Sequence, residues 1–496
     1  MKKKFLLNTI SSLLMQVVTL VCGFVLPRLI LEQYGSEVNG LTQSIKQFLG
    51  VITFLEMGVG QVIQSSLYKP LAQGDNAAVS RILASGGKFF RRIANALLIY
   101  VIALMAVYPF IAGQDYGWLY TAALIGAISI GSFAQYYFGI IDNLLLNADQ
   151  RGYIQYFSQI TVILLNTLAS VWMIRMGLSI QAVKLVSSMI FLARPLAVRW
   201  YIRSHYQIDR KIRYTGEPIR QKWNGIAQHI AAIVLEGTDT IVLTIFATLS
   251  DVSIYSVYFM VISGIRQFYQ SATAGIQSAV GSLWARQKLE ELNRVFGCME
   301  AALHLVTVFL FTCAGILIVP FVRVYTDGLT DAAYIQPLFA FVLVLAYAVR
   351  CLRTPYNILI LAGGHYKQTQ RCHIIAAILN LAVSVAAVSM WGLVGIAVGT
   401  LAALVYQTVW MMVYDSRNLL CWPLSRVARQ VAVDIMTAAL TVLACGRIEL
   451  TAVSYFGWFR MAVQVAAVAL AVTAAMALIF YRRQFAGMYR WLRKKG

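Results

Sequence analysis

The sequence predicts an all-α polytopic membrane protein with about fourteen transmembrane helices. Of the 496 residues, 59% are hydrophobic and 12% are charged, and the mean hydropathy is +0.70, whereas soluble domains are roughly 45–50% apolar. The apolar residues gather in runs of about 20 or more, the length that a helix needs to cross the hydrocarbon core of a bilayer. The ten-residue alternation that a transmembrane β-barrel requires is absent.

These runs define the expected spans. They lie at residues 6–31, 38–66, 89–112, 118–145, 154–177, 179–202, 225–248, 252–282, 300–321, 333–362, 371–391, 393–414, 429–450 and 459–481. The first run follows three lysines, as in a signal peptide, but it is long, contains Pro27 and Arg28, and lacks a small-residue cleavage site. We therefore interpret it as the first span.

Lys and Arg are distributed unevenly between the segments that join the spans. If the N-terminus is inside, the inner segments hold most of them, including seven from Arg199 to Lys222. The outer segments hold Arg175, Arg323, Arg447 and Arg460. The positive-inside rule then predicts that both termini are cytoplasmic. Because the cations are spread over short loops, the formal charge of +21 indicates a lipid bilayer as partner and no nucleic acid.

The seven cysteines and five histidines form no disulfide framework and no metal motif. His304, on an otherwise apolar helix, is expected to be a packed residue and not a ligand. We expect no bound cofactor, other than H⁺ or Na⁺ as a coupling ion.

The longest polar interruption divides the chain. The expected parts are an N-terminal lobe with spans 1 to 6 (1–203), a basic cytoplasmic linker (204–224), a C-terminal lobe with spans 7 to 12 (225–415), and spans 13 and 14 with a basic cytoplasmic tail (416–496). Residues 44–48 resemble 264–268 and residues 66–68 resemble 282–284, with offsets of 220 and 216. These matches predict two parallel six-helix repeats around a central cavity, although two apolar helices can also match by chance.

Ionisable side chains at bilayer depth are functional candidates, because burial there is costly unless the charge is paired or hydrated. Five cations are expected to line the cavity and bind substrate: Arg28, Lys46, Arg266, Arg350 and Arg353. Lys184 is expected to reach the outer headgroups instead. Since guanidinium groups bind phosphate oxygens in pairs, these residues favour an anionic cargo.

Three acids are candidates for ion coupling: Glu56, Glu236 and Asp239. Glu236 and Asp239 are spaced i, i+3 on one helical face. A carboxylate at this depth can bind a proton or Na⁺ and link that event to helix movement. The alternative is that the acids and the cavity cations form structural ion pairs. Three prolines, Pro27, Pro195 and Pro355, are expected kink sites.

Several segments carry a family resemblance. They are 37–41, 44–51, 55–60 and 64–68 near the N-terminus, and 238–244, 252–258, 353–357 and 364–370 further on. Over roughly spans 1 to 11, the sequence resembles bacterial polysaccharide-unit (Wzx-type) flippases of the multidrug/oligosaccharidyl-lipid/polysaccharide exporter superfamily.

The resemblance implies two six-helix lobes around a cationic cavity in the bacterial cytoplasmic membrane. It implies export of undecaprenyl-pyrophosphate-linked oligosaccharide repeat units from the inner to the outer leaflet by alternating access, in cell-surface polysaccharide biosynthesis, with polysaccharide assembly proteins as partners. Cation-coupled multidrug efflux, found in the same superfamily, is the alternative. We expect no enzyme, because a glycan polymerase or acyltransferase would need a large outer loop or a catalytic constellation. No Walker A motif is present for ATP use.

Overall fold

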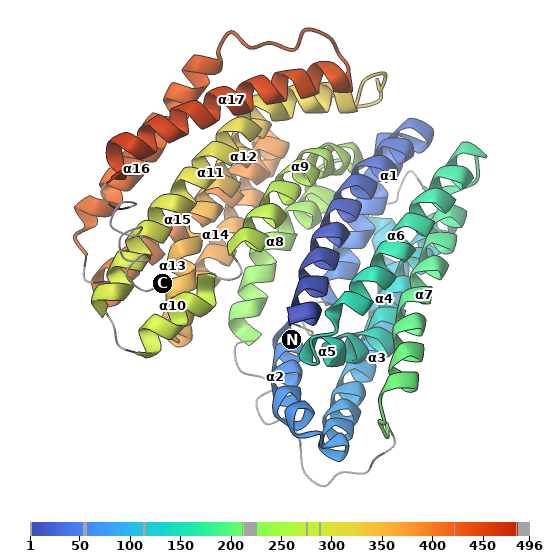
Figure 1. Ribbon diagram of the computed structural model, residues 1–496. Helices are drawn as coiled ribbons and strands as arrows, with labels where there is room; N and C mark the ends of the chain where they lie inside the picture. Colours follow the sequence, from blue (N-terminus) through green and yellow to red (C-terminus); the bar gives the residue numbers. More distant parts are fainter. Residues whose placement is uncertain are drawn as a thin grey trace. The chain divides into compact units, whose positions relative to one another are not determined.

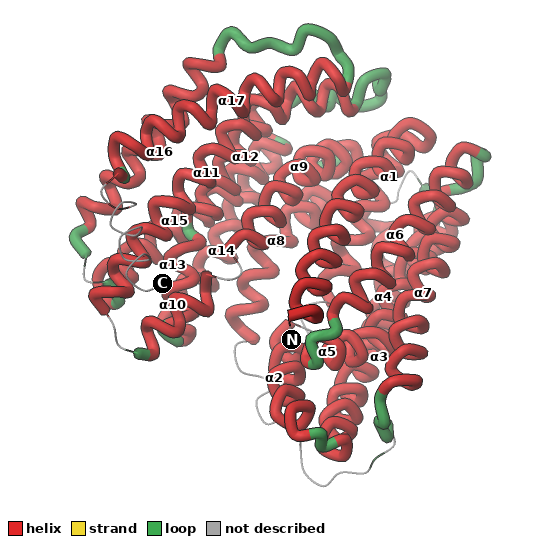
Figure 2. The backbone as a smooth tube through the Cα atoms, viewed as in Figure 1, coloured by secondary structure: helices red, strands yellow, loops and turns green. Residues whose placement is uncertain are grey.

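The computed structural model describes residues 2–52, 57–112, 116–210, 212, 226–273, 276–286, 289–420, 422–482 and 484. Over these residues the chain is helical, with loops between the helices and no strand (Figure 2). It forms two compact units: unit 1 is Met1–Ile233 with Thr248–Ser253, and unit 2 is Val234–Ala247 with Ile254–Gly496. The predicted all-α class is confirmed.

Unit 1 contains the first seven α-helices (Figure 1). They are α1 (Lys2–Gly50), α2 (Met57–Gln73), α3 (Asn76–Ala112), α4 (Trp118–Ala134), the π-helix η2 (Gln135–Gly139), α5 (Ile140–Ala148), α6 (Gly152–Arg175) and α7 (Ile180–His205). The first helix contains the first expected span and the beginning of the second, and it is kinked between them at Gly35, which has a φ of 84° and a ψ of 174°. Glycine adopts a positive φ without steric penalty, so the chain changes direction between the first and second expected spans.

The core of unit 1 forms where α1 packs on α6, α4 on α7, and α3 on α4. Leu41 and Ile45 of α1, one turn apart, are fully buried, as are Leu97 of α3 and Ile125 of α4. In a lipid environment such residues stabilise the unit mainly through close van der Waals packing between helices.

Unit 2 contains most of α8 (Ile226–Phe246) and α9 (Leu249–Thr273), followed by eight further helices. They are α10 (Ile276–Ala285), α11 (Leu289–Tyr325), α12 (Pro337–Leu352), α13 (Thr354–Ala362), α14 (Tyr366–Trp391), α15 (Leu393–Asn418), α16 (Leu424–Cys445) and α17 (Tyr455–Phe480). The α14 and α15 backbones come close at Gly395 and Gly399. A Cβ at Gly399 would overlap the Ser384 hydroxyl and the Asn380 carbonyl, so the small-xxx-small spacing permits this approach.

Within the described residues, eleven helical stretches are long and apolar enough to cross a membrane. One of them, Leu6–Gly50, contains the first expected span and the beginning of the second, which continues in α2. The seventh expected span corresponds to α8, which has only a shorter apolar stretch, Gly237–Phe246, and the eighth to α9 and α10. The described part of each expected range is thus mainly helical.

The expected linker 204–224 falls mostly on residues outside the described part, which resumes at Ile226. The proposed division of the chain at this linker therefore stays a prediction. Of the three expected kink sites, Pro355 lies in the first turn of α13, where a new helix begins. Pro27 and Pro195 lie inside α1 and α7.

The helix is irregular in the fourth span of each expected six-span repeat, which is span 4 in unit 1 and span 10 in unit 2. In unit 1, the π-helix η2 begins at Gln135. In unit 2, Arg353 separates α12 from α13. The two positions are 218 residues apart (353 minus 135), between the offsets of 216 and 220 that the sequence repeat predicts. This equivalence supports the parallel repeat, and π-bulges and breaks of this kind are frequent at functional sites.

Candidate functional site

In unit 1, two lysines from different helices come together. Lys46 follows the buried Ile45 on α1, and because successive residues are 100° apart on a helix its side chain leaves the core and is exposed. Lys184 on α7 is half-buried, and its ammonium group is close enough to that of Lys46 for the two charges to repel. Ser44, two residues before Lys46, accepts a 2.7 Å hydrogen bond from the hydroxyl of Tyr108, which fixes this part of α1.

The interaction of Lys184 with Lys46 was not predicted from the sequence. The position of Lys184 near the start of α7 indicated a side chain that reaches outer headgroups, and that expectation stays a prediction. The two lysines lie 138 residues apart in sequence (184 minus 46), and neither helix alone indicates that their charges interact.

Arg28 has an acidic partner on its own helix. Its Nη2 atom lies 2.8 Å from Oε1 of Glu32, one turn later, and the Glu32 side chain is 47% exposed. This pair lies just before the break at Gly35. Glu32 was not among the acidic candidates that the sequence indicated, which were Glu56, Glu236 and Asp239.

In unit 2, three of the predicted cavity cations gather in one place. Arg266 comes from α9, Arg350 from the last turn of α12, and Arg353 from the junction of α12 and α13. All three guanidinium groups influence the buried Cys351 thiol electrostatically, and all three residues are half-buried. We call these residues the arginine triad.

Packing between α9 and the end of α12 positions the triad. The hydroxyl of Tyr269 on α9 donates a 3.0 Å hydrogen bond to the backbone carbonyl of Cys351. The guanidinium of Arg266 lies 5.9 Å from the centre of the Phe259 ring, a cation–π distance. Three planar cationic groups from two helices can together donate many N–H bonds to phosphate oxygens.

Asp239 is a buried carboxylate that neutral groups surround. It lies on α8 with 2% of its surface exposed. The hydroxyl of Tyr255 donates to Oδ2 at 2.9 Å, and the Thr400 hydroxyl lies 3.0 Å from Oδ1 and 2.9 Å from Oδ2. Asn380 donates to the Thr400 hydroxyl at 3.1 Å. Among the residues that the structure describes, no Lys or Arg forms an ion pair with Asp239.

The close pairing of α14 and α15 builds this site. Asn380 on α14 and Thr400 on α15 lie beside the Gly399 contact, and Thr238 of α8 donates to the Asn380 side chain at 2.8 Å. Oxygen ligands and one negative charge in a dry site suit a proton or a small hard cation. Of the other two acidic candidates, Glu56 lies outside the described residues, and only the backbone of Glu236 is described, as part of α8.

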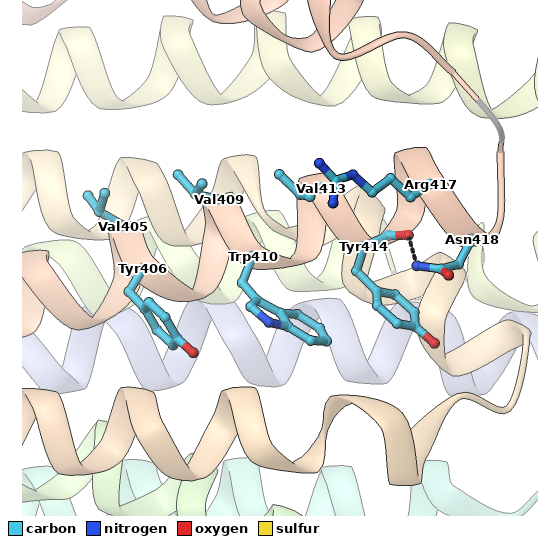
Figure 3. Close-up of a pocket in the computed structure, with 8 residues that line it drawn as sticks. All are labelled: Val405, Tyr406, Val409, Trp410, Val413, Tyr414, Arg417 and Asn418. Carbon is cyan, nitrogen blue, oxygen red and sulfur yellow. Dashed lines mark hydrogen bonds between the residues drawn. The ribbon is translucent and has the colours of Figure 1, made fainter.

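A groove of about 570 Å³ runs along one face of α15. Figure 3 shows its aliphatic row of Val405, Val409 and Val413 beside a row of aromatic side chains. The rings of Trp410 and Tyr414 stack with centroids 5.0 Å apart. The groove has Arg417 at one end and contains none of the predicted site residues, so it is a surface separate from the arginine triad and Asp239.

No protein-family model and no curated protein matches the sequence. Among solved structures, the fold is similar to that of the lipid II flippase MurJ in an inward closed conformation. The TM-score is 0.71 at 13% identity, and the match covers 97% of this chain and 100% of that one.

It is also similar to an inward-facing multidrug resistance MATE family transporter of the MOP superfamily, with a TM-score of 0.62 at 12% identity, covering 81% of this chain and 95% of that one. For the MATE multidrug transporter DinF-BH the TM-score is 0.56 at 14% identity, covering 84% and 95%. At these identities the comparisons establish the fold: this chain has the multi-pass helical fold of MurJ and the MATE transporters.

Proposed function

We propose that this protein is a flippase that moves a lipid-linked oligosaccharide with a pyrophosphate group from the inner to the outer leaflet by alternating access. The arginine triad of unit 2 is the observation that carries the proposal. Three guanidinium groups that all act electrostatically on Cys351 are together suited to pyrophosphate oxygens. Lys46 and Lys184 form a second positively charged region in unit 1.

The fold supports the same proposal. MurJ, whose structure is similar over nearly the full length of both chains, is a lipid II flippase. We infer that undecaprenyl-pyrophosphate-linked repeat units are the cargo here, in cell-surface polysaccharide biosynthesis. The protein would act in the bacterial cytoplasmic membrane with both termini in the cytoplasm, beside polysaccharide assembly proteins. Its cargo would be bound by Arg28, Lys46, Arg266, Arg350 and Arg353.

Asp239 supplies a means of driving the cycle. A buried carboxylate with only neutral donors can take up H⁺ or Na⁺. Binding of the cation would change how α8 packs against α14 and α15, and a cation gradient would then reset the transporter. Glu56 and Glu236 remain further candidates for this role.

Complementation of a flippase-deletion strain tests the cargo. We expect Arg266→Ala and Arg350→Ala each to lower surface polysaccharide about 10- to 100-fold, since each removes charge-assisted hydrogen bonds to phosphate. Arg350→Lys should retain part of the activity because it keeps the charge but loses the paired geometry. The matched control is Arg460→Ala, an exposed arginine on α17. Normal polysaccharide in both triad variants, at normal protein levels, would contradict the cargo assignment.

Multidrug efflux by cation antiport is the second candidate, because Asp239 and the likeness to MATE transporters favour it too. It predicts that expression lowers dye accumulation in cells, that Asp239→Asn abolishes this effect, and that Arg350→Ala leaves it intact. The flippase proposal predicts no change in dye accumulation.

A further inference from the structure

A second group of buried ionisable side chains lies in unit 2, apart from Asp239 and the arginine triad. It forms where α11, α13, α15 and α16 approach one another. Its titratable and charged members are Glu300 and His304 of α11, Tyr356 of α13, Asp415 of α15, Arg426, Arg429 and Asp434 of α16, and Tyr481 just after α17. We call it the α11–α16 cluster.

Two of its three carboxylates have hydrogen-bond donors. Glu300 accepts a 2.5 Å bond at Oε1 from the hydroxyl of Tyr356. Asp434 accepts at Oδ2 from Nδ1 of His304, at 2.6 Å, and at Oδ1 from the amide of Gln430, at 3.4 Å. Both acids are therefore held in fixed positions by side chains of the neighbouring helices.

Asp415 differs from the other two. It has no exposed surface, and neither of its carboxylate oxygens has a hydrogen-bond partner among the residues that the structure describes. It also lies close enough to Glu300 for the two negative charges to repel. A lone ionised carboxylate in a dry site is so unfavourable that such a group takes up a proton, and two acids that interact closely share one.

His304 adds an independent observation. Its ring is fully buried, and while Nδ1 binds Asp434, its Nε2 has no hydrogen-bond partner in the described part of the chain. His304 is one turn from Glu300 on α11, and its ring centre lies 6.3 Å from that of Tyr356, the donor to Glu300. An unpartnered imidazole nitrogen thus lies within the same acidic cluster.

Within the described part of the chain, neither Arg426 nor Arg429 forms an ion pair with Glu300 or Asp415. The guanidinium of Arg426 stacks 3.5 Å over the centre of the Trp422 ring. The charge of Arg426 acts on Glu300 only through space. Within the described residues, the ion pair of the cluster is that between His304 and Asp434.

We propose that Asp415 holds an exchangeable proton in the buried cluster that it forms with Glu300, His304 and Asp434. The site joins α16, which belongs to the thirteenth expected span, to three helices of the preceding repeat. Loss of the proton would leave a negative charge on Asp415 of α15 that repels the charge of Glu300 on α11, and this repulsion would favour separation of the two helices. Because His304 of α11 binds Asp434 of α16, a movement of α11 would also affect the packing of α16.

Infrared difference spectroscopy of the full-length protein in lipid nanodiscs tests the site. As the pH rises, wild-type protein should lose a carbonyl band of a buried protonated carboxylic acid. Asp415→Asn should lack this band at every pH. Glu449→Gln, which removes an exposed carboxylate after α16, should leave it unchanged. Since no transported substrate is needed, the result is independent of the cargo experiment.

Two further variants, His304→Gln and Asp415→Glu, extend the spectroscopic test. His304→Gln should shift the pH midpoint of the band, because it removes a titratable neighbour. If Asp415→Asn cannot be purified, Asp415→Glu should move the band to a different frequency. Identical spectra for wild type and the Asp415 variant would overturn the proposal. Loss of the band on adding Na⁺ at constant pH would also overturn it, because the site would then bind a metal cation.

Discussion

Two aspartates that are buried to nearly the same extent differ in the groups that bind their carboxylates. Asp142 on α5 of unit 1 has 1% of its surface exposed, and its Oδ1 binds Nη2 of Arg210 at 2.6 Å. Asp239 on α8 of unit 2 has 2% exposed and is bound by the hydroxyls of Tyr255 and Thr400. Arg210 holds one oxygen of the Asp142 carboxylate in a direct ion pair, which connects Arg210 to α5. The neutral donors around Asp239 orient its carboxylate and leave its charge available to a mobile cation.

The largest expected effect on stability comes from removing Arg210, the partner of Asp142. Arg210→Ala should lower the free energy of unfolding by about 3 kcal/mol, because it leaves a buried charge without its partner. Titration of unfolding in mixed detergent micelles measures this. Adding Asp142→Asn to Arg210→Ala should recover most of the loss, since the charge is then also gone. A change within about 0.5 kcal/mol for Arg210→Ala would contradict the comparison.

The next effect concerns the scaffold of Asp239. Gly399→Ala should cost about 2 kcal/mol, because its Cβ overlaps the backbone of α14. It should also weaken any stabilisation by cations, since Thr400 is the adjacent residue. The control is Gly23→Ala on α1, where nothing lies within 4 Å of the added Cβ. If both variants unfold at the same denaturant concentration, the α14–α15 contact does not position the site.

Asp239→Asn should change the free energy of unfolding by less than about 1 kcal/mol, because a neutral amide replaces a charge that no arginine matches. Wild-type protein should gain about 1.4 kcal/mol when its coupling cation, H⁺ or Na⁺, is ten times above the dissociation constant. The variant should gain nothing. Thermal unfolding over a series of Na⁺ concentrations and pH values measures both. A large loss of stability in Asp239→Asn without cation would place Asp239 in the same structural class as Asp142.

The smallest effect is expected for the pair of Arg28 and Glu32. Glu32→Ala should change stability by about 0.3–0.5 kcal/mol, because Glu32 is 47% exposed and exposed i, i+4 pairs are weak. The same unfolding titration applies. A loss above about 1 kcal/mol would mean that this pair stabilises the protein as strongly as a buried one.

The fold was predictable because span length and hydropathy are properties of contiguous sequence. The separation of the first two spans at Gly35 and the helix start near Pro355 both follow from single residues. The arginine triad was also accessible: Arg350 and Arg353 share a helical face, and the repeat relates Arg266 to Lys46.

Other parts of the site depend on contacts between distant helices. Thr400 lies 161 residues from Asp239 in sequence, and a threonine inside an apolar run is not distinctive. The interaction between the charges of Lys184 and Lys46 likewise joins two helices that are far apart in sequence. His304 was expected to be a packed residue and is fully buried. Its bond to Asp434 connects spans 9 and 13, and span 13 lies outside the repeat that the sequence predicts.

The interruption of the fourth span in both units bears on the history of the chain. A duplication that copied a six-span ancestor would carry one inherited irregularity into both descendants, at Gln135–Gly139 and at Arg353. The irregular helical geometry would then predate the divergence of the two halves. In that case Arg350 and Arg353 lie at or beside a position where the ancestral helix was already irregular.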